Sequence, residues 1–273
     1  FSYKMMTQQS AVALFKTAYL NRHALSMLFL GFSAGVPILL IFSSLGLWLR
    51  EAGIDRSTVT MFSWAALGYS FKFIWSPLVD PLPLPMLGKM LGQRRSWLLL
   101  SQVFIITAIV MMAMTDPAKV APSVMALGAV LLGFSAATQD IVIDAYRIES
   151  APSQMQTALS ASYVAGYRIG MIVSGAGALY LAELFGSQEG MYQYVAWQKT
   201  YLIMATVMLI GVATTLLICE PIRQVRSMTA KTEDHIRLCV VFVISVLAFV
   251  MTYRLMGGIL PESKSVIVAF LLG

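Results

Sequence analysis

Six long apolar runs follow one another in the first 219 residues, and short polar segments separate them. Each run is long enough to cross a hydrocarbon core of about 30 Å as an α-helix. Of the 273 residues, 58% are hydrophobic and only 12% are charged, a balance that excludes an ordinary soluble domain. The sequence therefore predicts an all-α polytopic membrane protein, with spans at about residues 24–49, 57–79, 96–114, 121–143, 157–182 and 196–219.

The connections between these runs are short, so we expect residues 1–219 to form one six-helix transmembrane bundle. The longest polar stretch follows at residues 220–237 and is the best candidate for a linker. Residues 238–273 contain a seventh apolar run, at about 238–256, and the start of another that stops after nine residues. Nine residues are too few to span a membrane, so we expect the chain to be a fragment of a longer protein.

Positive charges concentrate in alternate loops of the predicted bundle. This asymmetry follows the positive-inside rule, so we expect the amino terminus and the linker to lie in the cytoplasm. It also accounts for the net charge of +6 without nucleic acid as a partner. The loops assigned to the cytoplasm carry Lys4, Lys16, Arg22, Lys89, Arg94, Arg95, Arg147, Arg223, Arg226, Lys231 and Arg237, and the opposite loops carry Arg50, Arg56, Lys119 and Lys199.

Small residues recur every four positions on two of the predicted spans. Such stripes let helix backbones approach closely inside a membrane, where lipid offers no hydrophobic drive for association. We therefore expect close packing along both stripes. The first stripe contains Gly31 and Gly35, and the second contains Gly166, Gly170, Ser174 and Ala178.

Three spans contain an ionisable residue away from their ends. Lys72 and Asp140 each lie seven residues before the expected cytoplasmic end of a helix, a rise of about 10 Å. Arg168 lies eleven residues into the fifth span, about 16 Å deep and close to the bilayer centre. Charged side chains at such depths are costly and usually face a cavity or a partner. We expect these three to converge on the inner half of the bundle.

Structural explanations compete with a functional role for the two cations. Lys72 could extend its ammonium group along its long stem to the inner interface. For Arg168 such an extension is much harder from the middle of the membrane, and its face of the helix is turned away from the small-residue stripe. The other residues on that face are small to medium in size and would leave room for a ligand: Ala161, Val164, Ala165, Ile172 and Gly175.

The fourth span ends in a cluster of polar and charged residues. Asp140 and Asp144 share one face of the helix, and Arg147 follows Asp144 by three residues, a spacing that allows an ion pair. We expect Asp144, Arg147 and Glu149 to form a structural charge latch at the cytoplasmic end. Asp140 lies deeper, where desolvation favours the protonated carboxyl group, so it is our candidate for an exchangeable proton.

Sequence signatures of enzymes are absent. The two histidines and two cysteines form no metal-ligand pattern, and the chain has neither a glycine-rich phosphate loop nor a nucleophile elbow. We therefore expect no enzymatic activity, no metal and no cofactor.

Three segments have distinctive sequences: residues 71–80 (FKFIWSPLVD), 139–147 (QDIVIDAYR) and 166–170 (GYRIG). Together they resemble the AmpG muropeptide permeases, a branch of the major facilitator superfamily. The likeness extends from about Arg22 to Pro221. Asp80 and the run Gly92–Trp97 are similar to the loop signature of the superfamily, with residues 81–91 as an insertion. The related acetyl-CoA transporter branch shares parts of this pattern and stays open as an alternative.

The resemblance implies a facilitator fold of two six-helix bundles, of which this chain contains the first, with a substrate cavity between them. It also implies proton-coupled import of anhydromuropeptides (GlcNAc-anhydroMurNAc species) across the bacterial inner membrane for peptidoglycan recycling. An anionic sugar-peptide suits the two cations, so the expected substrate ligands are Lys72, Arg168, Gln139 and Tyr167, with Asp140 as the proton carrier. The expected gating latch comprises Asp80, Arg94, Arg95, Asp144, Arg147 and Glu149.

Two other functions fit the same residues. A carrier of acetyl-CoA or another organic anion would use the same cations for a different ligand. A membrane sensor or scaffold that transports nothing would use the charges for stability alone.

Overall fold

The computed structural model describes residues 19, 21–55, 62, 65–79, 84–120, 122–187, 190–221 and 251. The chain divides into two compact units, residues 1–223 and 224–273, and the helices described below belong to the first. Three of the sequence predictions fall largely outside the described residues. They are the linker at 220–237 beyond Pro221, the seventh span at 238–256 apart from Met251, and the latch residue Asp80.

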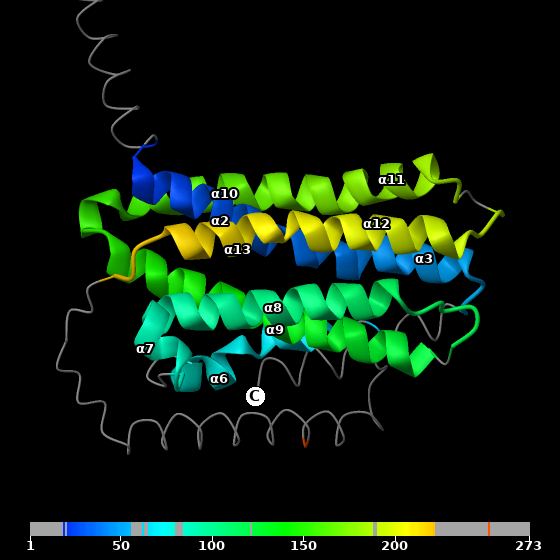
Figure 1. Cartoon of the computed structure of the whole chain (residues 1–273), viewed down its shortest axis with the longest axis horizontal. Coiled ribbons are helices and arrows are strands. Elements are labelled where there is room, and N and C mark those ends of the chain that lie inside the picture. The colour runs from blue at the N-terminus through cyan, green and yellow to red at the C-terminus, as the bar shows by residue number, and fades with distance from the viewer. Residues whose placement is uncertain are drawn as a thin grey trace, which may run out of the picture. The chain divides into compact units, whose positions relative to one another are not determined.

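Helices build the described part of the first unit, and most of them run side by side (Figure 1). The first half comprises α2 (Arg22–Leu39), the π-helical η1 (Leu40–Ser44), α3 (Leu45–Glu51), α5 (Ala65–Ser70), α6 (Lys72–Val79), α7 (Leu87–Leu91) and α8 (Gln93–Ala113). The second half comprises α9 (Pro122–Ser150), the 3-10 turn η3 (Ser153–Met155), α10 (Gln156–Ile172), the π-helical η4 (Val173–Gly177), α11 (Ala178–Leu184), α12 (Tyr194–Val207) and α13 (Leu209–Leu217).

Five helices within the described residues are long and apolar enough to cross a membrane, and the prediction of an all-α polytopic membrane protein is confirmed. They are Arg22–Glu51, Gln93–Ala113, Ser123–Ser150, Ser153–Leu184 and Tyr194–Leu217. The predicted second span is described in part, as α5 and α6.

The fourth helix is longer than its apolar run. We expected this span to end near residue 143, but α9 continues to Ser150, where Pro152 follows in extended conformation. Polar residues can continue a helix beyond the hydrocarbon core, because water solvates their side chains there. Arg147 and Glu149 therefore lie on the helix itself rather than on a loop after it.

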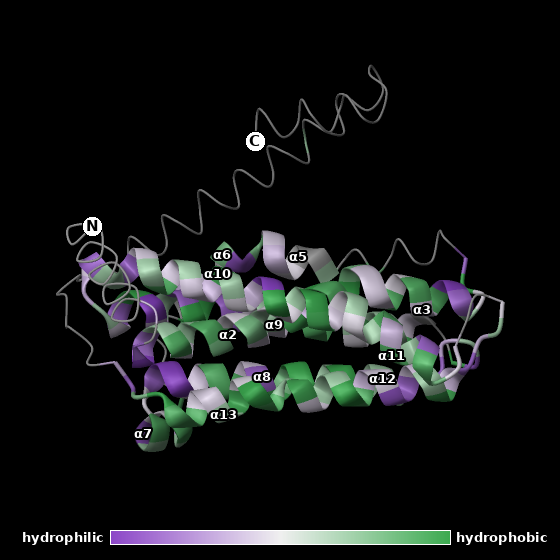
Figure 2. Ribbon diagram, turned by 90° about the horizontal axis from the view of Figure 1, so that it is seen from above, coloured by the Kyte–Doolittle hydropathy of each residue, from purple (hydrophilic) through white to green (hydrophobic). Residues whose placement is uncertain are grey.

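The helices are arranged in layers (Figure 2). Helices α8, α12 and α13 lie on one side, α5, α6 and α10 lie toward the opposite side, and α2 and α9 lie between them. Large aromatic side chains fill the core where the first and sixth spans meet. Trp48 stacks on Trp197 with ring centroids 5.7 Å apart, and Tyr201 packs against Trp48 at 4.7 Å. All three are fully buried.

Glycine residues bring the backbones of α2 and α10 into direct contact, which confirms the packing that the small-residue stripes predict. A methyl group on any of four glycines would collide with a backbone carbonyl oxygen of the facing helix. Lipid cannot drive such helices together, so close backbone packing has to hold them. The colliding pairs are Gly31 with Tyr163, Gly35 with Tyr167, Gly166 with Leu28, and Gly170 with Phe32.

A π-helical turn interrupts each of the same two spans, and the two turns, η1 and η4, contact each other. Such turns insert an extra residue and disturb the ladder of backbone hydrogen bonds. Side chains satisfy two of the carbonyl oxygens here: the Ser44 hydroxyl donates to Ser174 O (2.9 Å), and the Tyr201 hydroxyl donates to Leu40 O (3.1 Å).

The packing of α2 against α10 predicts a large effect for a very small substitution. We expect Gly166→Ala to lower the free energy of unfolding by about 2 kcal/mol, because the added methyl group pushes two backbones apart. Thermal unfolding of the purified protein in detergent measures this effect. Gly46→Ala on α3 is the matched control, since its methyl group would meet nothing within 4 Å. Equal destabilisation by the two variants would contradict the prediction.

Candidate functional site

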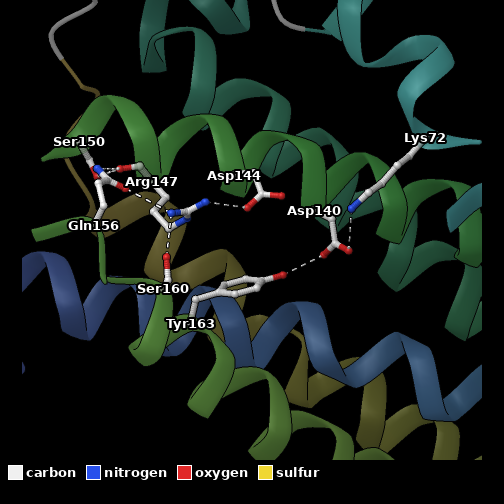
Figure 3. Close-up of polar contacts among 8 residues, drawn as sticks. All are labelled: Lys72, Asp140, Asp144, Arg147, Ser150, Gln156, Ser160 and Tyr163. Carbon is white, nitrogen blue, oxygen red and sulfur yellow. Dashed lines mark hydrogen bonds and ion pairs between the residues drawn. The ribbon is translucent and has the colours of Figure 1, made fainter. Parts of the chain in front are cut away.

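Asp140 lies at the centre of a polar cluster that joins three helices (Figure 3). It is 8% exposed on α9, and the Tyr163 hydroxyl on α10 donates to Oδ1 at 3.3 Å. Lys72 is the first residue of α6, after a turn at Phe71, and its Nζ lies 3.9 Å from Asp140 Oδ2. Two of the predicted functional residues, Lys72 and Asp140, are therefore in contact.

Tyrosine side chains surround this carboxyl group. Tyr69 on α5 and Tyr167 on α10 lie near enough to Asp140 to interact with its charge, and Tyr163 bonds it directly. The Tyr69 hydroxyl is buried without a hydrogen-bond partner among the described residues. Neither Tyr69 nor Tyr163 was among the functional residues predicted from the sequence. The spacing of Tyr163 and Tyr167 could have indicated the site, because it places two phenol groups on one side of a membrane helix. Buried hydroxyl groups there need hydrogen-bond partners.

Arg147 connects the end of α9 to the start of α10 (Figure 3). Its guanidinium group lies 3.5 Å from Asp144 Oδ1, which confirms the ion pair expected from their spacing. It also donates to the Ser160 hydroxyl (2.8 Å) and to Gln156 Oε1 (3.3 Å), while the Gln156 amide donates back to Arg147 O (3.1 Å). These bonds fix the turn between the fourth and fifth spans.

Glu149 pairs with Arg94 on α8. The guanidinium of Arg94 donates to both oxygens of Glu149, at 2.8 and 2.6 Å, and only 6% of the Arg94 side chain is exposed. The predicted latch residues therefore form two separate pairs, Asp144 with Arg147 and Glu149 with Arg94. Whether they act as a gate remains a prediction.

The start of α8 is tied to the segment that follows the sixth span. Glu220 accepts hydrogen bonds from the backbone N–H groups of Arg94 (2.7 Å) and Arg95 (3.1 Å). Its carboxylate lies against Gly92, whose φ of 90° and lack of a side chain make room for it. The Arg95 guanidinium donates to the last carbonyl groups of α13, those of Thr215 (3.0 Å) and Leu216 (2.7 Å).

Gln139 is fully buried inside the bundle. Its amide nitrogen donates to the Ser33 hydroxyl on α2 at 3.0 Å, and its amide oxygen has no partner among the described residues. This environment is the packed interior rather than the Lys72 side of α9. A role of Gln139 in substrate binding remains a prediction, as does one for the half-buried Tyr167.

Arg168 is exposed near the middle of its span, at the sixteenth of the 32 residues from Ser153 to Leu184. Its guanidinium group contacts Met171 Sδ at 3.8 Å, and no carboxylate among the described residues pairs with it. No contact joins it to Lys72 or Asp140 in this part of the chain. The expected convergence of all three residues is therefore seen only for Lys72 and Asp140.

The face of α10 around Arg168 differs from the expected one at a single position. Its neighbours at positions 161, 164, 165 and 172 are exposed, whereas Gly175 is buried against Leu39. Gly175 lies in η4, and the extra residue of the π-helical turn rotates the helix out of its regular register. Sequence periodicity assumes a regular helix and therefore misplaced Gly175.

Among the described residues, no group of three or more His, Cys, Asp or Glu side chains could hold a metal ion. The functional groups that the described site offers are two cationic side chains, a buried carboxyl group and several phenol hydroxyls.

Comparison with known proteins identifies relatives of the chain. The model of a family described as acetyl-coenzyme A transporter 1 matches residues 24–237. A Rickettsia felis protein named as a transporter, AmpG 4, is 42% identical over 189 residues, which cover 69% of this chain and 43% of that protein. The anhydromuropeptide permease of Escherichia coli K12 is 37% identical over 195 residues, which cover 71% of this chain and 37% of the permease. The chain thus spans less than half the length of these curated relatives.

The two charge pairs at the end of α9 predict different costs for removing one carboxylate. We expect Glu149→Gln to lower the free energy of unfolding by about 3 kcal/mol, because it removes the carboxylate that makes two short charge-assisted bonds to the buried Arg94. Asp144→Asn is the matched control on the same helix. Its side chain is 52% exposed, so we expect a loss of less than about 1 kcal/mol. Chemical unfolding in detergent measures both, and a larger loss for Asp144→Asn would contradict this ranking.

Proposed function

The chain belongs to the acetyl-coenzyme A transporter 1 family, and we propose that it is the amino-terminal bundle of a proton-coupled importer of anhydromuropeptides. The relatives named AmpG and anhydromuropeptide permease support this substrate. The proposed protein works in the bacterial inner membrane, with its amino terminus in the cytoplasm, and supplies peptidoglycan recycling. The proposed organisation is a bundle at residues 1–219, a linker at 220–237 and the start of the following segment at 238–273.

The position of Arg168 is the observation that carries the proposal. A guanidinium group at the middle of a membrane helix is costly in lipid, and this one is exposed without a carboxylate partner among the described residues. It therefore needs a water-filled cavity or an anionic ligand on its side of α10. An anhydromuropeptide, with carboxylates on its muramyl and peptide parts, is such a ligand.

Lys72 supplies a second cation on the same side of the bundle. It lies on α6, and α6 and α10 both lie away from the layer of α8, α12 and α13 (Figure 2). In the proposed mechanism, Lys72 and Arg168 bind substrate anions, Tyr167 contacts the substrate beside Arg168, and Asp140 carries the proton. The buried Gln139 has a smaller claim to substrate contact, because it is bonded to Ser33 in the interior. The proposed latch comprises Asp80, Arg94, Arg95, Asp144, Arg147 and Glu149.

Uptake by proteoliposomes tests this function. We expect the full-length protein that contains this chain to take up labelled anhydromuropeptide when a proton gradient is imposed, and to stop when the gradient is dissipated. Arg168→Ala should lower uptake at least about tenfold without lowering the melting temperature, because it removes a substrate contact. Lys199→Ala, which changes an exposed lysine over the Phe185 ring, is the control and should keep uptake unchanged. An Arg168→Ala protein that loses stability but keeps ligand binding would favour the scaffold or sensor.

Acetyl-CoA is the second candidate substrate, and the description of the matching family favours it. It too is an anion that two cations could bind. In the uptake assay, we expect unlabelled anhydromuropeptide to compete with the labelled substrate and acetyl-CoA to have no effect at the same concentration. Competition by acetyl-CoA without competition by the sugar-peptide would select the second candidate.

A further inference from the structure

Among the described residues, the half-buried Glu149 and the buried Asp140 are both paired with cations on other helices, and they differ in how tightly they are held. Glu149 receives two short hydrogen bonds from Arg94, at 2.8 and 2.6 Å. Asp140 has one hydrogen bond of 3.3 Å from Tyr163 and an ammonium group at 3.9 Å. Charge-assisted hydrogen bonds normally measure about 2.7–2.9 Å. Asp140 is therefore buried, but it lacks the short charge-assisted hydrogen bonds that hold Glu149.

Lys72 is placed to serve two anions. Its side chain is 37% exposed, whereas that of Asp140 is 11% exposed. Lys72 reaches Asp140 from α6 and Tyr163 reaches it from α10 (Figure 3), so the ammonium group can move toward the exposed side while the carboxylate stays behind. A lysine side chain is flexible and binds anions as a point charge, which suits such an exchange.

The surroundings of Asp140 would not replace the lost cation. Among the described residues, the titratable groups that face it are Lys72 from α6, the phenols of Tyr163 and Tyr167 from α10 and of Tyr69 from α5, and the carboxylate of Asp144 on its own helix. Gln139, its neighbour on α9, donates to the uncharged hydroxyl of Ser33 on α2. The unpartnered Tyr69 hydroxyl could bond the carboxyl group in either protonation state.

We propose that Lys72 is shared between Asp140 and an anionic group of the substrate, so that substrate binding transfers the ammonium group and obliges Asp140 to take up a proton. The substrate anion gains Lys72 as its counter-ion, and Asp140 becomes a neutral carboxyl group with a proton taken from water. An unpaired carboxylate is too costly to leave in this buried position. The exchange rests on the proposed function and specifies how one bound anion is coupled to one proton.

The first experiment measures proton uptake on binding. Purified full-length protein in weakly buffered detergent is titrated with GlcNAc-1,6-anhydroMurNAc, with the carboxamide of the same sugar as the neutral control. We expect about one proton taken up per bound anion and none with the carboxamide. Because binding takes up a proton, affinity should rise as the pH falls, by up to about tenfold for each pH unit. Anion binding without proton uptake would overturn the exchange.

Two substitutions give opposite effects that a merely structural pair would not give. Asp140→Asn removes the carboxylate that competes with the substrate anion for Lys72. This variant should therefore bind the anion at every pH with the affinity that the wild-type protein reaches only at low pH. It should take up no proton on binding. Lys72→Gln should bind the anion more weakly and also take up no proton. Lys199→Ala, which changes the exposed lysine over the Phe185 ring, should keep the wild-type proton uptake. Weaker anion binding by a folded Asp140→Asn protein would overturn the proposal.

A ligand-free measurement separates the exchange from the identity of the substrate. Without any ligand and at a mildly alkaline pH, the wild-type protein should lack the infrared carbonyl band of a protonated carboxyl group. At the same pH, Lys72→Gln should show this band. The double variant Lys72→Gln/Asp140→Asn should lose it. Absence of the band in Lys72→Gln would overturn the exchange, whatever the protein transports. If the band appears there, and acetyl-CoA but not the anhydromuropeptide induces it in the wild-type protein, the exchange holds and the muropeptide substrate is wrong.

Discussion

The backbone contact between α2 and α10 is the interaction on which the candidate site depends. Gly31 and Gly35 lie against the carbonyl groups of Tyr163 and Tyr167, the two α10 tyrosines next to Asp140. The first span therefore sets the height and rotation of the phenol groups that face a carboxylate on the fourth. Inside a membrane this arrangement has no hydrophobic substitute, because lipid solvates a separated helix as well as a packed one. The glycines thus act on the site without belonging to it.

Two groups of charged residues in the bundle differ in how completely their charges are paired. At the end where α8, α9 and α13 meet, Arg94, Arg95, Glu149 and Glu220 satisfy one another and the helix termini with short bonds. Deeper in the bundle, Lys72, Asp140 and Arg168 are loosely paired or exposed. Complete pairing suits a permanent joint, whereas incomplete pairing leaves binding capacity for something that arrives and departs.

Local patterns in the sequence were sufficient for much of the fold. Apolar runs predicted the spans, four-residue spacing predicted the contacts of Gly31 and Gly166, and three-residue spacing predicted the pair of Asp144 and Arg147, because all of these follow from the geometry of one helix. The partner of Glu149 lies 55 residues away on another helix, and no local pattern indicates it. The π-helical turns were equally hidden, so the burial of Gly175 was missed. Lys72 and Asp140 were identified by depth, but their contact became visible only in the packed bundle.

The bonds of Glu220 have a mechanical consequence for the chain that leaves the bundle. The sixth span ends at Leu217, and three residues later Glu220 is held by the first backbone N–H groups of α8. Arginines on two other helices, Arg95 and Arg22, hold the last carbonyl groups of α13 in the same region. Tension applied to the chain after Glu220 would therefore act on α8, the third span, before it could unwind the sixth span. Helix α8 thus anchors this end of the bundle against a pulling force.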